Sequence, residues 1–384
     1  MAFTLIPPFR VNYTFSDLLH AAFIKESSTK WSNLCVDILS RFFKNENISL
    51  TSSGRNGLYI ILRSLPQSKV FVPAYTCPVV IEAIRLSEKK IVFVKTSATT
   101  FNADIFSGVD DNSIVIATHQ YGNPCDIVAI AKFCKEKKAV LIEDCAAALG
   151  STINERLAGT FGDFAIFSFN STKLLNAPSM GGFIICKERV DLIRIIKGCK
   201  YDSSSGLFKV KQFIRSTVFC LAKNRFIYPI IYHLYIKKTI NNHTDILESI
   251  DNSIEETYRH PFYDWQAKVL YKQLKMLPQI IKERKELFDY FDKRLNSSLF
   301  RKPIINSEAT CCRYTIRVKN REVFYKQCVN KGVDMDFSFN HIICPDDFHE
   351  ERMIADEILN IPFYVGMKES ERAYIVDTLN SIRI

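Results

Sequence analysis

The chain has 384 residues, and its 51 Lys plus Arg against 41 Asp plus Glu give a formal net charge of +10. A hydrophobic fraction of 47% and a charged fraction of 24% are ordinary for a globular protein and exclude wholesale disorder. With 13 glycines and 12 cysteines, the chain is neither collagen-like nor a small disulfide-rich scaffold. The positive surplus is compatible with nucleic acid, a membrane surface or an anionic small molecule.

The cysteine pattern and the N-terminus indicate the compartment. No CxxC spacing and no His-rich tract occur, so we expect no metal site. The N-terminus lacks the basic stretch and continuous apolar core of a secretory signal. No apolar run reaches the roughly 20 residues of a membrane-spanning helix. We therefore expect a cytoplasmic protein with reduced thiols.

Short β-rich runs alternate with helical patterns from about residue 47 to residue 187. The runs are near-continuous in Val, Ile and Phe, which is typical of strands buried on both faces of a parallel sheet. They predict strands at Val70–Tyr75, Ile91–Lys95, Ile114–His119, Val140–Asp144, Ala165–Phe169 and Gly182–Cys186. Between two of them, Asp126 is placed to cap a helix. The alternation predicts an α/β domain with a mixed, mostly parallel central sheet and helices on both sides.

The pattern changes after about residue 203. Residues 203–243 contain no Asp or Glu but seven basic residues among large apolar ones, namely Lys209, Lys211, Arg215, Lys223, Arg225, Lys237 and Lys238. A long helix is predicted after about Asp251, through Trp265 to Leu277, and short strands and helices follow from about Thr310. We therefore predict an N-terminal segment (1–46), a large α/β domain (47–250) with a basic aromatic helical insertion (203–243), and a smaller α+β domain (251–384).

Polar residues stand where the predicted strands end. Tyr75 and Thr76 close the first strand, and His119, Asp144 and Lys173 end or follow later ones. Ligands of open parallel sheets bind beyond the carboxyl ends of the strands. We therefore expect a histidine, a carboxylate and a lysine to converge at one edge of the sheet.

Small residues open a predicted helix just before the first of these strands, in the sequence Thr51-Ser52-Ser53-Gly54-Arg55-Asn56-Gly57. Such a helix N-terminus presents free N–H groups and the positive end of the helix dipole, which suits a phosphate. A plain helix cap is the alternative.

Lys173 and Asp144 each have an ordinary alternative, a solvated loop lysine and an ion-pair partner. A partly desolvated lysine can also form a Schiff base with an aldehyde cofactor, and a buried carboxylate can keep a pyridine nitrogen protonated. Together with a phosphate site, these are the groups that pyridoxal phosphate needs.

The chain resembles the DegT/DnrJ/EryC1/StrS family of nucleotide-sugar aminotransferases, which have the fold type I pyridoxal-phosphate architecture. Stretches in the family's order, covering most of the chain, carry the resemblance: SSGRNGLYIILRSL (52–65), VFVPAYTCPVVIEAI (70–84), THQYGNPCDI (118–127), LIEDCAAALGS (141–151), GDFAIFSFNSTKLLNAPSMGGFIIC (162–186), DWQAKVLYKQL (264–274) and ILNIPFY (358–364). The resemblance implies that Lys173 holds the cofactor covalently and Asp144 pairs with its ring nitrogen. It further assigns the phosphate to Gly54, Arg55, Asn56 and Ser168, and it implies a homodimer with the site at the subunit interface.

Several positions depart from the family pattern. Cys77 replaces an aromatic residue that stacks on the cofactor ring, although a subset of the family shares Tyr-Thr-Cys-Pro. Ala147 replaces a glutamine near the cofactor, and Met180 replaces an acidic residue before the paired glycines. Arg259-His260-Pro261 stands where Asn-Tyr-Arg is usual. Tyr75, His119 and Met180 are the positions predicted on the substrate side.

By this resemblance, the chain is an aminotransferase that uses an amino acid such as glutamate to convert a keto-sugar, usually nucleotide-linked, into an amino sugar for surface polysaccharide or glycoconjugate biosynthesis. Two alternatives stay open, a non-catalytic relative acting as a scaffold or partner subunit and a different pyridoxal-phosphate reaction such as sugar dehydration. Retention of Lys173 argues against a dehydratase of the kind that carries His at this position.

The stretch 203–243 allows two interpretations. Its basic and aromatic residues suit helices that rest on the inner face of an anionic membrane. Aromatic stripes more often mean packing, for example at a dimer interface. No motif supports nucleic-acid binding.

Overall fold

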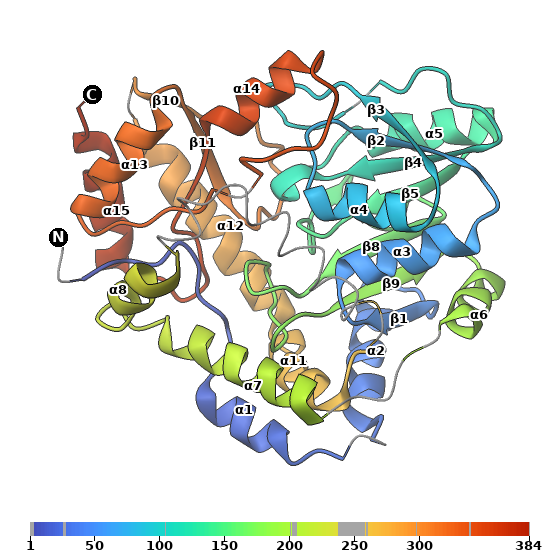
Figure 1. The fold of residues 1–384 in the computed structure, drawn as a ribbon, viewed down its shortest axis with the longest axis horizontal. Helices are drawn as coiled ribbons and strands as arrows, with labels where there is room; N and C mark the ends of the chain where they lie inside the picture. The colour runs from blue at the N-terminus through green and yellow to red at the C-terminus, as the bar shows by residue number, and fades with distance from the viewer. Residues whose placement is uncertain are drawn as a thin grey trace.

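The computed structural model describes residues 4–25, 28–103, 105–199, 201, 206–236, 258, 260–296, 298–337 and 339–383. Within them, a seven-stranded sheet flanked by helices stands beside a separate three-stranded sheet with its own helices (Figure 1). A two-stranded hairpin, β6 (Thr152–Ile153) with β7 (Arg156–Leu157), completes the described β-structure.

The large sheet has the strand order β1-β9-β8-β5-β4-β2-β3. Its strands are β1 (Ile48–Thr51), β2 (Lys69–Pro73), β3 (Lys90–Val94), β4 (Ser113–Thr118), β5 (Val140–Asp144), β8 (Phe164–Ser168) and β9 (Gly182–Cys186). The strands from β3 to β8 in this order pair in parallel, β9 is antiparallel to β8, and β1 is antiparallel to β9. The prediction of a mixed, mostly parallel sheet is therefore confirmed, and all six predicted strands are present within two residues at their ends.

Helices cover both faces of this sheet, which explains why its strands are apolar on both sides. On one face lie α3 (Gly54–Ser64), α4 (Pro78–Leu86) and α6 (Arg189–Gly198), in one buried cluster with Ile114, Ile142 and Ile184. On the other face, α5 (Ile127–Lys137) packs on Val115, while α2 (Lys30–Phe43) and α11 (Asp264–Leu274) pack around Phe183. As predicted, Asp126 caps α5, with its carboxylate accepting the Ala129 N–H at 3.2 Å.

Gly182, the first residue of β9, has backbone on all sides. A Cβ at this position would lie 2.5 Å from the Phe167 carbonyl oxygen and 2.6 Å from the Gly54 nitrogen. We expect Gly182→Ala to lower the free energy of unfolding by about 2 kcal/mol, because main-chain atoms cannot move aside as a side chain can. Urea denaturation measures this loss. Gly198→Ala is the matched control: among the described residues, no atom beyond its own stretch of α6 lies within 4 Å of the added methyl, so no loss is expected. Equal losses in both variants would contradict the steric argument.

The three-stranded sheet is antiparallel, in the order β10 (Phe300–Arg301), β11 (Tyr314–Val318) and β12 (Ile358–Ile361). Its core includes apolar side chains of α12 (Leu277–Arg294), α13 (Arg321–Asn330) and α15 (Glu369–Ser381), and α14 (His349–Glu357) leads into β12. This agrees with the predicted C-terminal α+β architecture. The domain boundary near residue 251 stays a prediction, since residues 251–257 lie outside the described part and α11 packs with the large sheet.

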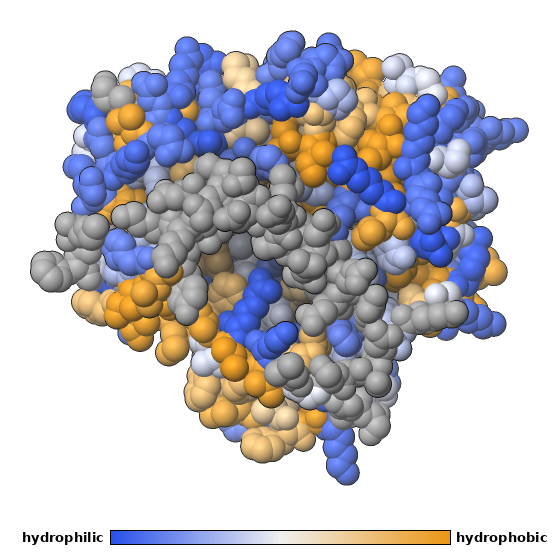
Figure 2. Space-filling model, in the orientation of Figure 1, coloured by the Kyte–Doolittle hydropathy of each residue, from blue (hydrophilic) through white to orange (hydrophobic). Residues whose placement is uncertain are grey.

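The described part of the basic stretch is helical. It forms α7 (Gly206–Leu221), the short helix α8 (Tyr228–Ile231) and a π-helical turn (Tyr232–Ile236), and α7 packs beside the N-terminal helix α1 (Phe15–Ala22). Figure 2 shows apolar side chains gathered over the region where Figure 1 places these helices. In the residues that the structure describes, no helix is both long and apolar enough to cross a membrane. The predicted residues 203–205 and 237–243 lie outside the described part.

A buried carboxylate ties α8 to the smaller sheet. Asp334 accepts hydrogen bonds from the hydroxyls of Tyr228 and Tyr325 at 2.5 and 2.8 Å and from the Met335 N–H at 2.8 Å. Burial raises the pKa of Asp334 to about 6, although these hydrogen bonds act in the opposite direction.

The native state therefore holds this proton more tightly than the unfolded chain, and stability falls as pH rises between the unfolded pKa and about 6. The full shift corresponds to about 3 kcal/mol. In the Asp334→Asn variant this carboxyl group is absent. We therefore expect its free energy of unfolding to lack this decrease between about pH 4 and pH 7. Urea denaturation at both pH values measures it, and an unchanged pH dependence in the variant would contradict the assignment.

Candidate functional site

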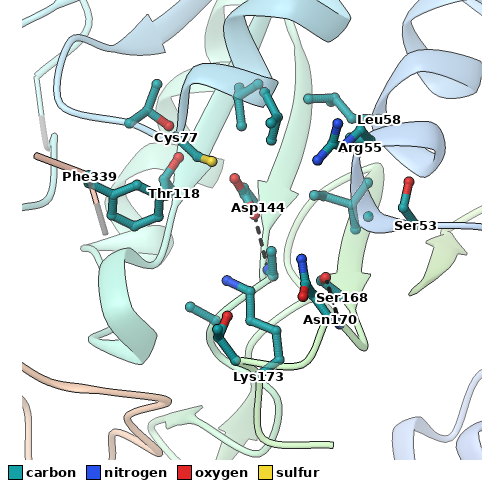
Figure 3. A pocket seen from close by; sticks show the side chains of 18 of the residues that line it. Ser53, Arg55, Leu58, Cys77, Thr118, Asp144, Ser168, Asn170, Lys173 and Phe339 are labelled. Carbon is teal, nitrogen blue, oxygen red and sulfur yellow. Dashed lines mark hydrogen bonds between the residues drawn. The ribbon is translucent and has the colours of Figure 1, made fainter. Parts of the chain in front are cut away.

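A cavity of about 330 Å³ opens at the carboxyl ends of the parallel strands. Figure 3 shows that its labelled side chains come from several elements and point toward one centre. Nine of the eleven residues predicted for the site line it: Gly54, Arg55, Cys77, His119, Asp144, Ala147, Ser168, Lys173 and Met180. Asn56 and Tyr75 do not.

Lys173 lies in a tight turn after β8 that the rest of the chain holds in place. Its N–H donates to the Asn170 carbonyl at 2.9 Å. The buried side-chain amide of Asn176 donates to the carbonyls of Asn170, Ser171 and Lys173 at 2.9 to 3.1 Å. Three bonds from one amide fix the backbone of this turn, so the lysine side chain projects into the cavity from a rigid base (Figure 3).

Asp144 is the last residue of β5, and its carboxylate points into the same cavity as the Lys173 amine (Figure 3). It is 6% exposed and accepts the Ala146 N–H at 3.0 Å. Burial raises the pKa of Asp144, while the Ala146 N–H and the positive charge of Lys173 act in the opposite direction. A cationic partner placed against this carboxylate would therefore stabilise its ionised form.

The N-terminus of α3 forms one wall of the cavity. Ser53 caps the helix by accepting the Asn56 N–H on its hydroxyl at 3.1 Å, which leaves the N–H groups of Gly54 and Arg55 at the open end. Ser168 and Asn170, at the end of β8, line the same side (Figure 3). A helix of 11 residues with small residues, an arginine and hydroxyls at its start is suited to a phosphate.

Asn56 lies beneath this N-terminus. Its side-chain amide donates to the Ser52 hydroxyl at 2.7 Å, and its backbone N–H is taken by the Ser53 cap. With these two hydrogen bonds Asn56 stabilises the N-terminus of α3. Its predicted contact with a phosphate stays a prediction.

His119 lines the cavity with both ring nitrogens engaged. Its Nδ1 accepts the Cys125 N–H at 3.2 Å, so Nε2 carries the proton and donates to Glu143 at 3.2 Å. The Glu143 carboxylate also accepts backbone N–H groups of the turn after β7, from Gly159, Phe161 and Gly162. The Cys145 sulfur lies within 4.8 Å of these two side chains. Through these contacts His119 and Glu143 hold the backbone of the cavity wall in place.

Cys77, Ala147 and Met180 line the cavity where the family pattern has larger or more polar groups. Burial raises the pKa of the Cys77 thiol, and the positive charges of Lys173 and Arg55 act in the opposite direction. Tyr75 lies outside the cavity lining, where its hydroxyl bonds to that of Tyr121 at 2.7 Å.

The smaller sheet supplies a second wall that the sequence did not predict. Arg313, just before β11, forms an ion pair with Asp336 at 2.5 Å, and its guanidinium lies 5.8 Å from the Phe339 ring centre. Phe339, Asn340 and His341 complete this wall. Burial lowers the pKa of Arg313, but the charge of Asp336 acts in the opposite direction and the pKa is raised overall. Arg313 lies in the stretch from about Thr310 for which only short strands and helices were predicted, so the sequence carried no specific signal for it.

Two hydroxyls in the lining bear on what the cavity can hold. The buried Oγ1 atoms of Thr76 and Thr118 have no hydrogen-bond partner within the described residues. Buried polar atoms of this kind are normally satisfied, so they favour a polar ligand in the cavity. With a lysine amine, a buried carboxylate and a helix N-terminus facing the same space, the residues present fit pyridoxal phosphate.

Comparisons with known proteins agree with this fold. The chain is 32% identical over 161 residues to a UDP-N-acetyl-3-dehydro-alpha-D-glucosamine 3-aminotransferase of Acidithiobacillus ferrooxidans, covering 40% of this chain and 43% of that protein. The chain thus spans less than half the length of this curated relative. A dTDP-3-amino-3,6-dideoxy-alpha-D-galactopyranose transaminase of Aneurinibacillus thermoaerophilus is 21% identical over 86% of this chain and 84% of its own length.

Among solved structures, the sugar aminotransferase CalS13 of Micromonospora echinospora superposes with a TM-score of 0.73 and 15% identity, over 98% of this chain and all of that one. At this identity the likeness shows a common fold, and it confirms the predicted fold class. Residues 37–213 match the DegT/DnrJ/EryC1/StrS aminotransferase family. This match confirms, over these residues, the resemblance read from the motifs.

Proposed function

We propose that the chain is a pyridoxal-phosphate-dependent aminotransferase that converts a keto-sugar, linked to a nucleotide, into an amino sugar, with an amino acid such as glutamate as donor. The observation that carries the proposal is the position of Lys173 opposite Asp144, with the open N-terminus of α3 on the same cavity. The relatives named above act on nucleotide-linked sugars according to their names.

Pyridoxal phosphate, when bound, supplies an aldehyde that condenses with amines and a ring that accepts electrons. Lys173 would hold it covalently and, once displaced by the donor, move a proton from the donor's α-carbon as general base. In the second half of the reaction, the same amine would deliver a proton to the sugar carbon that gains nitrogen. The rigid turn that Asn176 fixes keeps the amine within reach.

Asp144 would accept a hydrogen bond from the ring nitrogen and hold its positive charge. Ser53, Gly54, Arg55 and Ser168 would bind the phosphate through N–H groups, a guanidinium and hydroxyls. On the opposite wall, Arg313 provides a fixed cation, paired with Asp336, for the donor carboxylate or the substrate phosphates.

The test is a half-reaction. Purified protein is loaded with pyridoxal phosphate, mixed with glutamate and followed by its visible absorbance, while 2-oxoglutarate is measured in the supernatant. We expect a shift of the band with one 2-oxoglutarate per site. Nucleotide-linked keto-sugars added next should restore the band and give an amino sugar detectable by mass. A protein that takes up no cofactor would overturn the proposal.

A non-catalytic relative is the second candidate, because the Ala147 and Met180 side chains line the cavity without polar groups. It predicts uptake of cofactor without the glutamate half-reaction. In that case Ala147→Gln with Met180→Glu should restore turnover if these two positions are the cause. A sugar dehydratase predicts loss of oxygen from the sugar without net transfer of nitrogen, which the same mass analysis distinguishes.

We further propose a homodimer in the cytoplasm, with the site at the subunit interface and a role in surface polysaccharide or glycoconjugate synthesis. The family resemblance supports this assembly. Sedimentation velocity of the holoenzyme tests it, with a monomer at all concentrations as the contrary result.

A further inference from the structure

The outer surface of α7 and α8 is apolar in a way that packing among the described residues does not explain. Its large side chains are between 38% and 65% exposed, at Val210, Ile214, Val218, Leu221, Phe226, Ile230 and Leu234. We call these seven residues the α7–α8 apolar face. Monomeric proteins rarely leave such a continuous apolar surface to water, and those that do generally use it for binding.

The spacing shows that the exposure is built into the helices. At about 3.6 residues per turn, Val210, Ile214 and Leu221 lie on one side of α7, while Phe208 and Phe219 point to the opposite side and pack in the core with α1. Phe226, Ile230 and Leu234 repeat the four-residue spacing along the next turns. The helix thus has a second apolar side beyond the one that its own fold buries.

Helix α1 extends this surface. Phe15, Leu19 and Phe23 follow the same four-residue spacing and are 47%, 43% and 88% exposed. The one acidic residue of α1, Asp17, is paired with Lys272 at 3.2 Å, so its charge is offset. In Figure 2, orange and tan side chains cover the lower left of the molecule, where Figure 1 places α8, α7 and α1.

Positive charge borders the apolar face. Lys211 is exposed on α7, and Arg225 lies exposed next to Phe226, with its guanidinium 5.4 Å from the centre of that ring. No Asp or Glu occurs in residues 203–243. An apolar helical strip with a cationic border is typical of helices that lie in the interface of an anionic bilayer.

The charge distribution argues against a second copy as the occupant. A two-fold contact would set the same patch against itself, bringing Lys211 and Arg225 of both copies together without any acid from this stretch. Like charges at an interface are unfavourable, whereas each lysine or arginine near an anionic surface gains binding energy. We therefore propose that the α7–α8 apolar face docks the protein on a membrane surface containing anionic phospholipids.

Co-sedimentation of the full chain with vesicles tests this. We expect binding to vesicles of phosphatidylcholine and phosphatidylglycerol in equal parts, little binding to phosphatidylcholine alone, and weaker binding as salt is added. Ile214→Ser with Ile230→Ser and Leu234→Ser should weaken binding at least about tenfold, because these side chains would no longer be buried in lipid. Lys211→Gln with Arg225→Gln should cost about fivefold per charge removed.

The matched control is Ile105→Ser with Val190→Ser and Ile304→Ser, which removes apolar side chains elsewhere that are even more exposed and should leave binding unchanged. All changed side chains are exposed, and thermal melting checks that each variant folds. Equal binding to both kinds of vesicle, or wild-type binding by the apolar-face variant, would overturn the proposal. A wild-type protein that stays in the supernatant would also overturn it. In that case, a changed sedimentation coefficient of the apolar-face variant would show that this face contacts a second copy of the chain.

Discussion

Lys173→Ala protein is expected to lose the visible absorbance of the lysine-bound cofactor and at least about 10³-fold in turnover. The reason is that one amine carries both tasks: it holds the cofactor covalently, and it moves protons at the reacting carbon. No other lysine lines the cavity within the described residues, so no neighbour can take over. Absorbance spectra of the reconstituted protein and the glutamate half-reaction measure the two losses separately.

Two further variants separate chemistry from folding. Lys173→Arg keeps the positive charge opposite Asp144 but cannot form the covalent link, so it should lose the absorbance as completely as alanine does. Lys138→Ala, at the exposed end of α5, should retain both absorbance and turnover. A Lys173→Ala protein that keeps the wild-type absorbance spectrum would contradict the role of this lysine, because the cofactor would then be bound elsewhere.

Much of the fold could be predicted because its signals are local. A strand buried on both faces must be a short apolar run, and the six predicted strands are such runs. The one strand of the large sheet that was not predicted is β1 (Ile48–Thr51). Only its two end residues are buried, and it pairs with β9 alone at the sheet edge, so its sequence ISLT is not continuously apolar. Edge strands of this kind resemble loops in sequence.

The site could be predicted on its sheet side for the same reason. The carboxyl ends of parallel strands lie at one edge of the sheet. The residues that follow these strands therefore lie close together, independently of how the rest of the chain folds. This brought Asp144 and Lys173 together. The wall formed by Arg313, Phe339 and His341 follows no such rule, because it depends on how the smaller sheet packs against the larger one. Periodicity in the sequence carries no information about that packing.

Two predicted residues show where local reasoning ends. Tyr75 follows its strand as expected, but its hydroxyl pairs with Tyr121, and Tyr121 takes the place in the cavity lining. Asn56 belongs to the small-residue helix start, yet its amide turns back to Ser52. Position in a motif gives the neighbourhood of a side chain, whereas its hydrogen bonds decide which way it points.

Asp144→Asn is expected to take up the cofactor on Lys173 and yet lose about 10²- to 10³-fold in turnover, the usual cost of removing one preorganised electrostatic contact. The amide has nearly the shape of the carboxylate and can still accept the Ala146 N–H. It cannot hold a positive charge on the ring nitrogen, so the charge that develops during proton transfer is less well stabilised. The glutamate half-reaction and the visible spectrum, recorded on the same sample, measure turnover and cofactor uptake.

Stability of the cofactor-free protein distinguishes this role from a structural one. Because burial raises the pKa of Asp144, its ionised form is held at a cost to the fold at neutral pH. Cofactor-free Asp144→Asn should therefore melt no lower than the wild type, although its turnover falls. An Asp144→Asn variant with wild-type turnover would show that this carboxylate is not required to stabilise a positive charge on the ring nitrogen. A variant that melts lower and takes up no cofactor would instead assign Asp144 to the support of the β5 turn.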